Sequence, residues 1–119
     1  MNRKISLLTL VALLGSTAAS ISLAAEVDLG ACEFTEQPVI VDGTKASKEE
    51  MTESASQVRN YIGAMQDSLA CLEQAEKDLG AEITPEQKVE VTDAYNTGVD
   101  KLNAVANNYN EQVRAFKNR

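Results

Sequence analysis

The sequence predicts an all-α fold: an antiparallel, coiled-coil-like two-helix hairpin with an extended N-terminal arm disulfide-linked to the first helix. Three observations lead to this prediction. Apolar residues recur at alternating steps of three and four along two long segments, which is typical of a coiled-coil seam. The short loop 80–83 between the segments favours antiparallel helices. The chain has two cysteines, Cys32 and Cys71, and both follow an export signal.

Residues 1–25 have the form of a signal peptide. Arg3 and Lys4 supply a positive start, residues 5–14 are almost entirely apolar, and small residues precede a cleavage position at Ala25 or Glu26. An uncleaved membrane anchor is the alternative, but the second half of the segment is small and hydroxyl-rich, which favours cleavage. We therefore expect a periplasmic protein that is not inserted in a membrane after cleavage.

Lipidation at Cys32 is a second alternative, because residues 29–32 read Leu-Gly-Ala-Cys, the form of a bacterial lipobox. Glu26 and Asp28 argue against it, since they place charge where a lipoprotein signal stays uncharged. Acylation of Cys32 would also leave Cys71 as a free thiol in an oxidising compartment. The disulfide and the lipid anchor exclude each other.

The arm occupies residues 26–46, which have no helical period and contain Pro38 and the turn signal Asp42-Gly43. The hairpin follows in residues 47–119. Its first helix is predicted over 48–79, because Ser47 and the glutamate three residues later form a capping box. Gly80 would end that helix with a left-handed cap.

The second helix is predicted over residues 85–117. Thr84 and Gln87 form another capping box, and Pro85 suits the first helical position. Arg114 and Lys117 complement the helix dipole at the other end.

The apolar seams of the two helices define which faces meet. We assign to the first helix Met51, Ala55, Val58, Ile62, Met65, Leu69, Leu72 and Leu79, and to the second Tyr95, Val99, Leu102, Ala106, Tyr109, Val113 and Phe116, with Val91, Gly98 and Val105 widening the stripe. A hairpin folded about the loop pairs residues whose numbers add up to about 164. Glu76 interrupts the seam and should lie opposite Lys88, where a salt bridge is expected and a ligand-binding carboxylate is the alternative.

Cys71 belongs to a second stripe, with Gln57, Tyr61, Ala64, Ser68 and Ala75. At 100° per residue it points roughly 140° away from the centre of the seam. The disulfide should therefore pin the arm against the first helix and should not join the two helices. An extended arm from Cys32 to Ala46 reaches about 45–50 Å, enough to double back along roughly 36 Å of helix, with Phe34 and residues 39–41 as its apolar contacts.

The composition excludes several functional classes. The chain has no histidine, no Cys-x-x-Cys pair and no glycine-rich phosphate loop, so we assign no catalytic, cofactor-binding or metal-binding residues and do not expect an enzyme. Its net charge is −7, and loss of the signal peptide with Arg3 and Lys4 lowers that charge further. Such an acidic chain has no basic patch for nucleic acid or anionic lipid.

A series of residues resembles a small family of exported proteins of Gram-negative bacteria. The series comprises Cys32, Pro38, Asp42-Gly43, Ala46, Met51, Val58, Tyr61 and Cys71-Leu72, with one proline where the family has two. The likeness spans about the first half of the mature chain. It implies secretion and a helical fold, and it implies no activity.

Residues 83–87, Ile-Thr-Pro-Glu-Gln, are similar to the Leu-Thr-x-x-Gln motif of the Spy/CpxP-type periplasmic chaperones. The same residues are also what a capped helix start requires. This chain has one copy where that family has two.

We therefore expect a protein that acts through contacts with a protein partner, or through self-association by its wide apolar stripe. The alternatives are a small holdase-type chaperone and a ligand- or ion-binding module. A polar strip beside the second seam is either a solvated flank or a recognition surface; it consists of Asn96, Asn103, Asn107 and Asn110.

Overall fold

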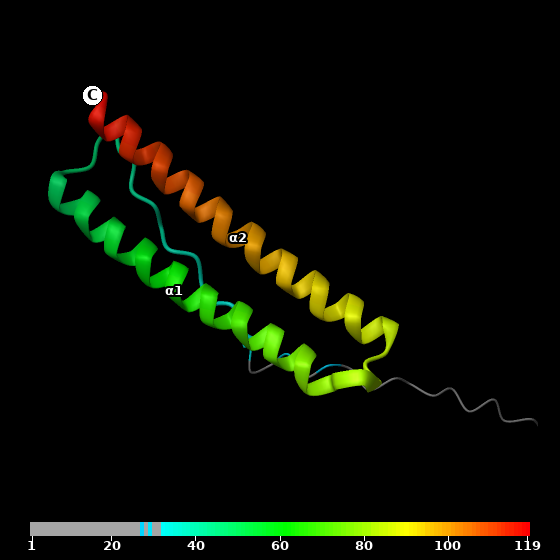
Figure 1. Cartoon of the computed structure of the whole chain (residues 1–119). Coiled ribbons are helices and arrows are strands. Elements are labelled where there is room, and N and C mark those ends of the chain that lie inside the picture. Colours follow the sequence, from blue (N-terminus) through cyan, green and yellow to red (C-terminus); the bar gives the residue numbers. More distant parts are fainter. Residues whose placement is uncertain (1–26, 28, 30–31) are drawn as a thin grey trace, which may run out of the picture.

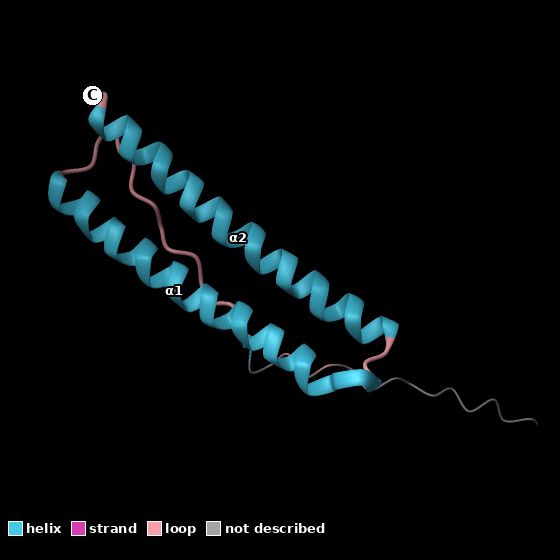
Figure 2. Ribbon diagram, in the orientation of Figure 1, coloured by secondary structure: helices cyan, strands magenta, loops and turns pink. Residues whose placement is uncertain are grey.

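The computed structural model is a helical hairpin (Figures 1 and 2). It describes residues 27, 29 and 32–119, so the predicted signal peptide and its cleavage position lie outside the described residues. Helix α1 spans Lys48–Leu79, a 3₁₀ turn η2 spans Gly80–Glu82, and helix α2 spans Pro85–Lys117. Both helix ranges agree with the predicted ones, and no strand occurs in the described part of the chain.

Both helices begin with the predicted capping boxes. The Ser47 hydroxyl accepts from the Glu50 N–H at 3.1 Å, and the Glu50 carboxylate accepts from the Ser47 N–H at 2.7 Å. Thr84 and Gln87 make the same reciprocal pair at the start of α2, with Pro85 as its first residue. These bonds satisfy backbone donors that a helix start leaves without partners. The helix start accounts for the residues that resemble the chaperone motif.

Gly80 ends α1, as predicted, but not with a left-handed cap. Its φ of 60° is positive while its ψ of −143° lies far from the left-handed helical region. Such a combination favours glycine, which has no Cβ. The chain leaves α1 directly into η2, so the reversal is tighter than a simple cap followed by a loop.

The two helices lie side by side and antiparallel, and η2 is part of the turn that connects them (Figure 2). Lys88 forms an ion pair with Glu76, which confirms the pairing expected from the hairpin register. Val58 of α1 and Val105 of α2 belong to one buried cluster, again as that register requires.

The arm runs beside both helices and not beside α1 alone (Figure 1). Its contacts with α1 are the ones predicted, through the disulfide of Cys71. Its contacts with α2 were not predicted. The Gly43 N–H donates to the Gln112 side-chain oxygen at 2.9 Å, and the Arg119 guanidinium donates to the Ala46 carbonyl at 2.6 Å. The arm therefore ties the two helices together as a third packed layer.

The core differs from the predicted seam for this reason. Its central cluster consists of Val58, Tyr61, Met65 and Val105, with Phe34, Ile40, Ile62, Leu102 and Tyr109 packed against it. On α2 the most buried positions are Val91, Gly98 and Val105, which were expected only to widen the stripe, while the predicted seam residues are half-buried. On α1, Ser54 and Tyr61 are buried although both lie outside the predicted seam. The predicted seam assumed that only the two helices pack together. The arm packs against them as well, so the helix faces that are turned toward the arm are also buried.

Candidate functional site

The disulfide fixes one end of the arm. Cys32 and Cys71 are bonded, with their Cα atoms 5.4 Å apart, and the bond joins the arm to α1 without joining the two helices. In this structure the Cys32 sulfur is therefore not available for the thioether of a lipid anchor. A disulfide of this kind is typical of a non-reducing, exported compartment.

Next to the disulfide, the arm seats an aromatic side chain in a notch of α2. The Ser68 hydroxyl donates to the Glu33 carbonyl at 2.8 Å, and this hydrogen bond holds the arm against α1. Phe34 then reaches Gly98, where an added Cβ would lie 2.7 Å from the tip of the ring and 2.8 Å from a methyl carbon of Leu69. The Lys101 ammonium lies 5.5 Å from the centre of the Phe34 ring, within range of a cation–π interaction. Gly98 is thus the position where arm, α1 and α2 meet.

The other end of the arm is held by a tight turn. The Asp42 carboxylate accepts from the Thr44 hydroxyl at 2.6 Å and from its N–H at 2.9 Å. These two hydrogen bonds hold the pKa of Asp42 below its usual value, because they stabilise the ionised form. Gly43 follows, so close to the Gln112 backbone carbonyl that a Cβ there would collide with it.

Between these two attachments, a shallow groove separates the arm from α1. We call it the arm–α1 groove. From the arm it is lined by Thr35, Glu36, Pro38, Val39 and Val41, and from α1 by Glu50, Glu53, Ser54, Gln57, Asn60, Tyr61 and Ala64. It offers carboxylates, amides, hydroxyls and an apolar lip. Such a set suits binding, and the groove contains no nucleophile paired with a base.

Two buried hydroxyls line the arm–α1 groove without a hydrogen-bond partner. Ser54 is 2% exposed and Tyr61 is 3% exposed, and their oxygen atoms are fully enclosed. A buried polar atom without a partner costs free energy, typically about 1–3 kcal/mol. The burial of Ser54 was not predicted from the sequence, because a serine one position from the predicted seam is normally solvated.

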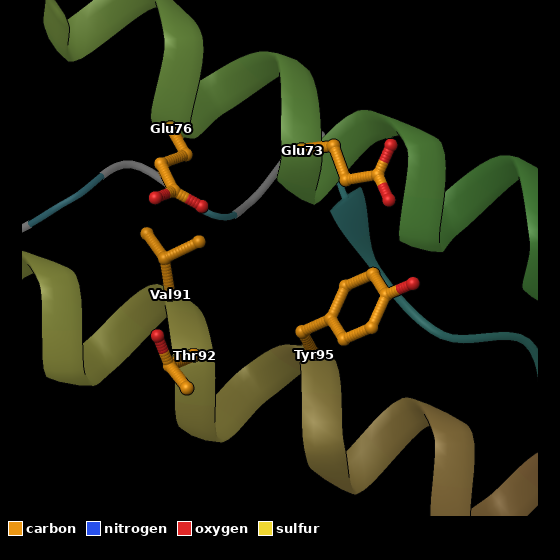
Figure 3. Close-up of a pocket in the computed structure, with 5 residues that line it drawn as sticks. All are labelled: Glu73, Glu76, Val91, Thr92 and Tyr95. Atoms are coloured by element: carbon orange, nitrogen blue, oxygen red, sulfur yellow. The ribbon is translucent and has the colours of Figure 1, made fainter.

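A separate hollow of about 310 Å³ lies between the helices near η2 (Figure 3). Its lining residues are Glu73, Glu76, Val91, Thr92 and Tyr95. Figure 3 shows the Glu76 carboxylate directed toward Val91, while the Glu73 carboxylate turns away from it. Glu76 is paired with Lys88, which is the salt-bridge interpretation of this residue. Among the described residues, no group of three or more acidic or cysteine side chains could hold a metal ion.

The asparagine strip lies on the surface of α2, where Asn96, Asn103, Asn107 and Asn110 are all exposed. It is remote from the arm, which packs near Gly98 and Gln112 on another side of the helix. The structure thus separates this strip from the arm–α1 groove, and within the described residues the buried side-chain oxygens without a partner belong to the lining of the groove.

Comparison with known proteins identifies no relative: no family model, curated protein or solved structure matches this chain. Neither α1 nor α2, the long helices of the described region, is apolar enough over a sufficient length to cross a membrane.

Proposed function

We propose that this is an exported periplasmic protein that acts by binding a protein partner and not by catalysis. The main support for the proposal is that the backbone of the arm has hydrogen-bonding groups without partners. Between residues 34 and 41 no backbone N–H or carbonyl group has a hydrogen-bond partner within the described residues. The side chain of Val39 in this stretch is 84% exposed.

An extended segment of this kind favours association with another chain. Unpaired backbone groups along a strand can pair with a second strand, and exposed apolar side chains gain free energy when a partner covers them. The arm is also held in place before any partner arrives, because the disulfide, Phe34 and the turn at Asp42 fix it to the hairpin. A fixed segment loses less conformational entropy on binding than a free one does.

Site-specific photo-crosslinking in cells tests this proposal. A photoreactive amino acid is placed at Val39, at Val89, which is 58% exposed, or at Asn103 of the asparagine strip. The proposal predicts a defined protein adduct from the periplasmic fraction at one or more of these positions. The exposed Asp67 on α1 serves as the control position. Adducts no stronger than those at Asp67, at all three positions, would refute it.

The purified protein distinguishes the alternatives of the same class. A holdase would suppress aggregation of unfolded client proteins at stoichiometric amounts, whereas a protein with one specific partner would not. A ligand-binding module would show a thermal shift with a small molecule, and the hollow beside Glu73 and Val91 is where that ligand would be expected.

A further inference from the structure

We infer that the arm–α1 groove binds an extended, basic segment of a partner protein. The inference rests on the proposed function and deepens it, because it names the surface and the chemistry of what that surface recognises.

The shape of the arm–α1 groove suits an extended chain. Three neighbouring hollows of about 350, 290 and 260 Å³ follow one another along the arm, the first two sharing Gln57 and the last two sharing Val41 and Glu50. They extend along α1 from Ala64 to Glu50, which is roughly 21 Å at 1.5 Å per residue. An extended chain covers that length with about six residues.

The charge of the arm–α1 groove suits a basic segment. Glu36, Glu50 and Glu53 line the groove and are exposed. None of these three carboxylates forms an ion pair within the described residues, and Glu36 and Glu53 also have no hydrogen-bond partner there, whereas Glu50 accepts from the Ser47 N–H. Lys45, at one end, is the cationic side chain among the described lining residues. A lysine or arginine of a bound segment would find carboxylates at several points along its length.

The backbone of the arm can form hydrogen bonds with a bound segment. The arm offers free backbone groups between residues 34 and 41, and Gln57 and Asn60 face them from α1. A segment laid beside the arm can pair with it as a second strand, and β-branched Val39 and Val41 favour that conformation.

Other occupants fit these observations less well. A metal ion lacks a suitable set of ligands in the described residues. Nucleic acid and anionic lipid would be repelled by the carboxylates. A second copy of this chain would bring the same acidic groove edge against this one, which costs free energy. A basic extended peptide satisfies the shape, the charge and the free backbone together.

Peptide binding to the disulfide-bonded mature protein tests the inference. The probe is a fluorescein-labelled heptapeptide that alternates lysine and valine, and a peptide with glutamate in place of lysine is its control. Binding is followed by fluorescence anisotropy in low and high salt. We expect the basic peptide to bind, the acidic one not to bind, and the affinity to fall with salt.

Matched variants locate the site. The double substitution Glu36→Gln with Glu53→Gln removes two groove charges, and Glu82→Gln with Glu111→Gln removes two exposed charges elsewhere. We expect the groove variant to bind about threefold to tenfold more weakly, at up to roughly 0.7 kcal/mol per exposed pair, and the control variant to bind within twofold of the parent. Amide NMR shifts on binding should concentrate in residues 34–41 and 50–64, and circular dichroism verifies that both variants are folded.

Equal weakening by the two double variants, shifts outside the groove, or no binding of the basic peptide would overturn the inference. These outcomes do not decide the proposed function. A partner adduct at Val89 or Asn103, combined with failure of the peptide, leaves that proposal standing while it removes the arm–α1 groove as the binding surface.

Discussion

Gly98→Ala is the sharpest test of how the arm and the helices fit together. The added methyl group would lie 2.7 Å from the tip of the Phe34 ring and 2.8 Å from a Leu69 methyl carbon, where about 3.4 Å is the lower end of ordinary contact. Phe34 cannot simply withdraw, because the disulfide at Cys32 is two residues away. The Phe34 ring and the Leu69 side chain must therefore shift from their present positions to admit the methyl group.

The expected magnitude follows from two opposing effects. Overfilling a packed core costs typically about 1–3 kcal/mol. Alanine favours a helix over glycine by about 0.8–1 kcal/mol, which offsets part of that cost. We expect Gly98→Ala to lower the free energy of unfolding by up to about 2 kcal/mol, or up to several degrees in Tm for a domain of this size.

Gly63 supplies a matched control, because it lies within α1 and a Cβ there would meet nothing within 4 Å. Gly63→Ala should raise the free energy of unfolding by up to about 1 kcal/mol through helix propensity alone. Urea denaturation followed by circular dichroism measures both variants. In a Phe34→Ala background the cost of Gly98→Ala should become smaller, since the ring is gone and only the contact with Leu69 remains. If Gly98→Ala stabilises as much as Gly63→Ala, the packing argument at this position is refuted.

Three further predictions concern the arm and its groove. Removing the disulfide with Cys32→Ala and Cys71→Ala opens a loop with a sequence separation of 39 residues and should cost about 4 kcal/mol in the chain-entropy model, measured by urea denaturation; a cost under about 1 kcal/mol would contradict it. Tyr61→Phe removes a hydroxyl without a partner, so stability should stay unchanged or rise by up to about 1 kcal/mol in the same assay; a clear loss would show that the hydroxyl is bonded. The pKa of the Asp42 carboxyl should lie below the usual value for an aspartate in an NMR pH titration, because Thr44 stabilises its ionised form. Since that pKa is lowered on folding, its contribution to stability is present above the unfolded value and is lost as the pH falls through the folded one; Thr44→Val should move the titration upward.

The helices and the disulfide were predictable from local rules. The capping pair at Ser47, the proline at Pro85 and the period of the apolar residues each act within a few residues, so the helix bounds follow from the sequence. The direction of Cys71 followed from helix geometry in the same way, and it predicted the arm–α1 bond correctly.

The position of the arm over α2 was not predictable from those rules. It depends on Gly98 and Gly43, two glycines that let other parts of the chain approach closely. In the sequence, Gly43 suggested only a turn, and Gly98 only a position that widens the apolar stripe of the second helix. The arm–α1 groove arises from the same arrangement, because its walls come from segments that meet only after the arm has packed. Ser54 and Tyr61 are buried for that reason and carry no local signal of it.

The way the arm is laid down also determines where the described chain begins and ends in space. The Val27 N–H donates to the Glu90 carboxylate near the start of α2, whereas Arg119 reaches Ala46 beyond the opposite end of that helix. About 40 Å of helix separates Glu90 from Lys117. The two ends of the described chain therefore lie near opposite ends of α2. A group linked to the protein at residue 27 and another linked at residue 119 would therefore lie near opposite ends of α2.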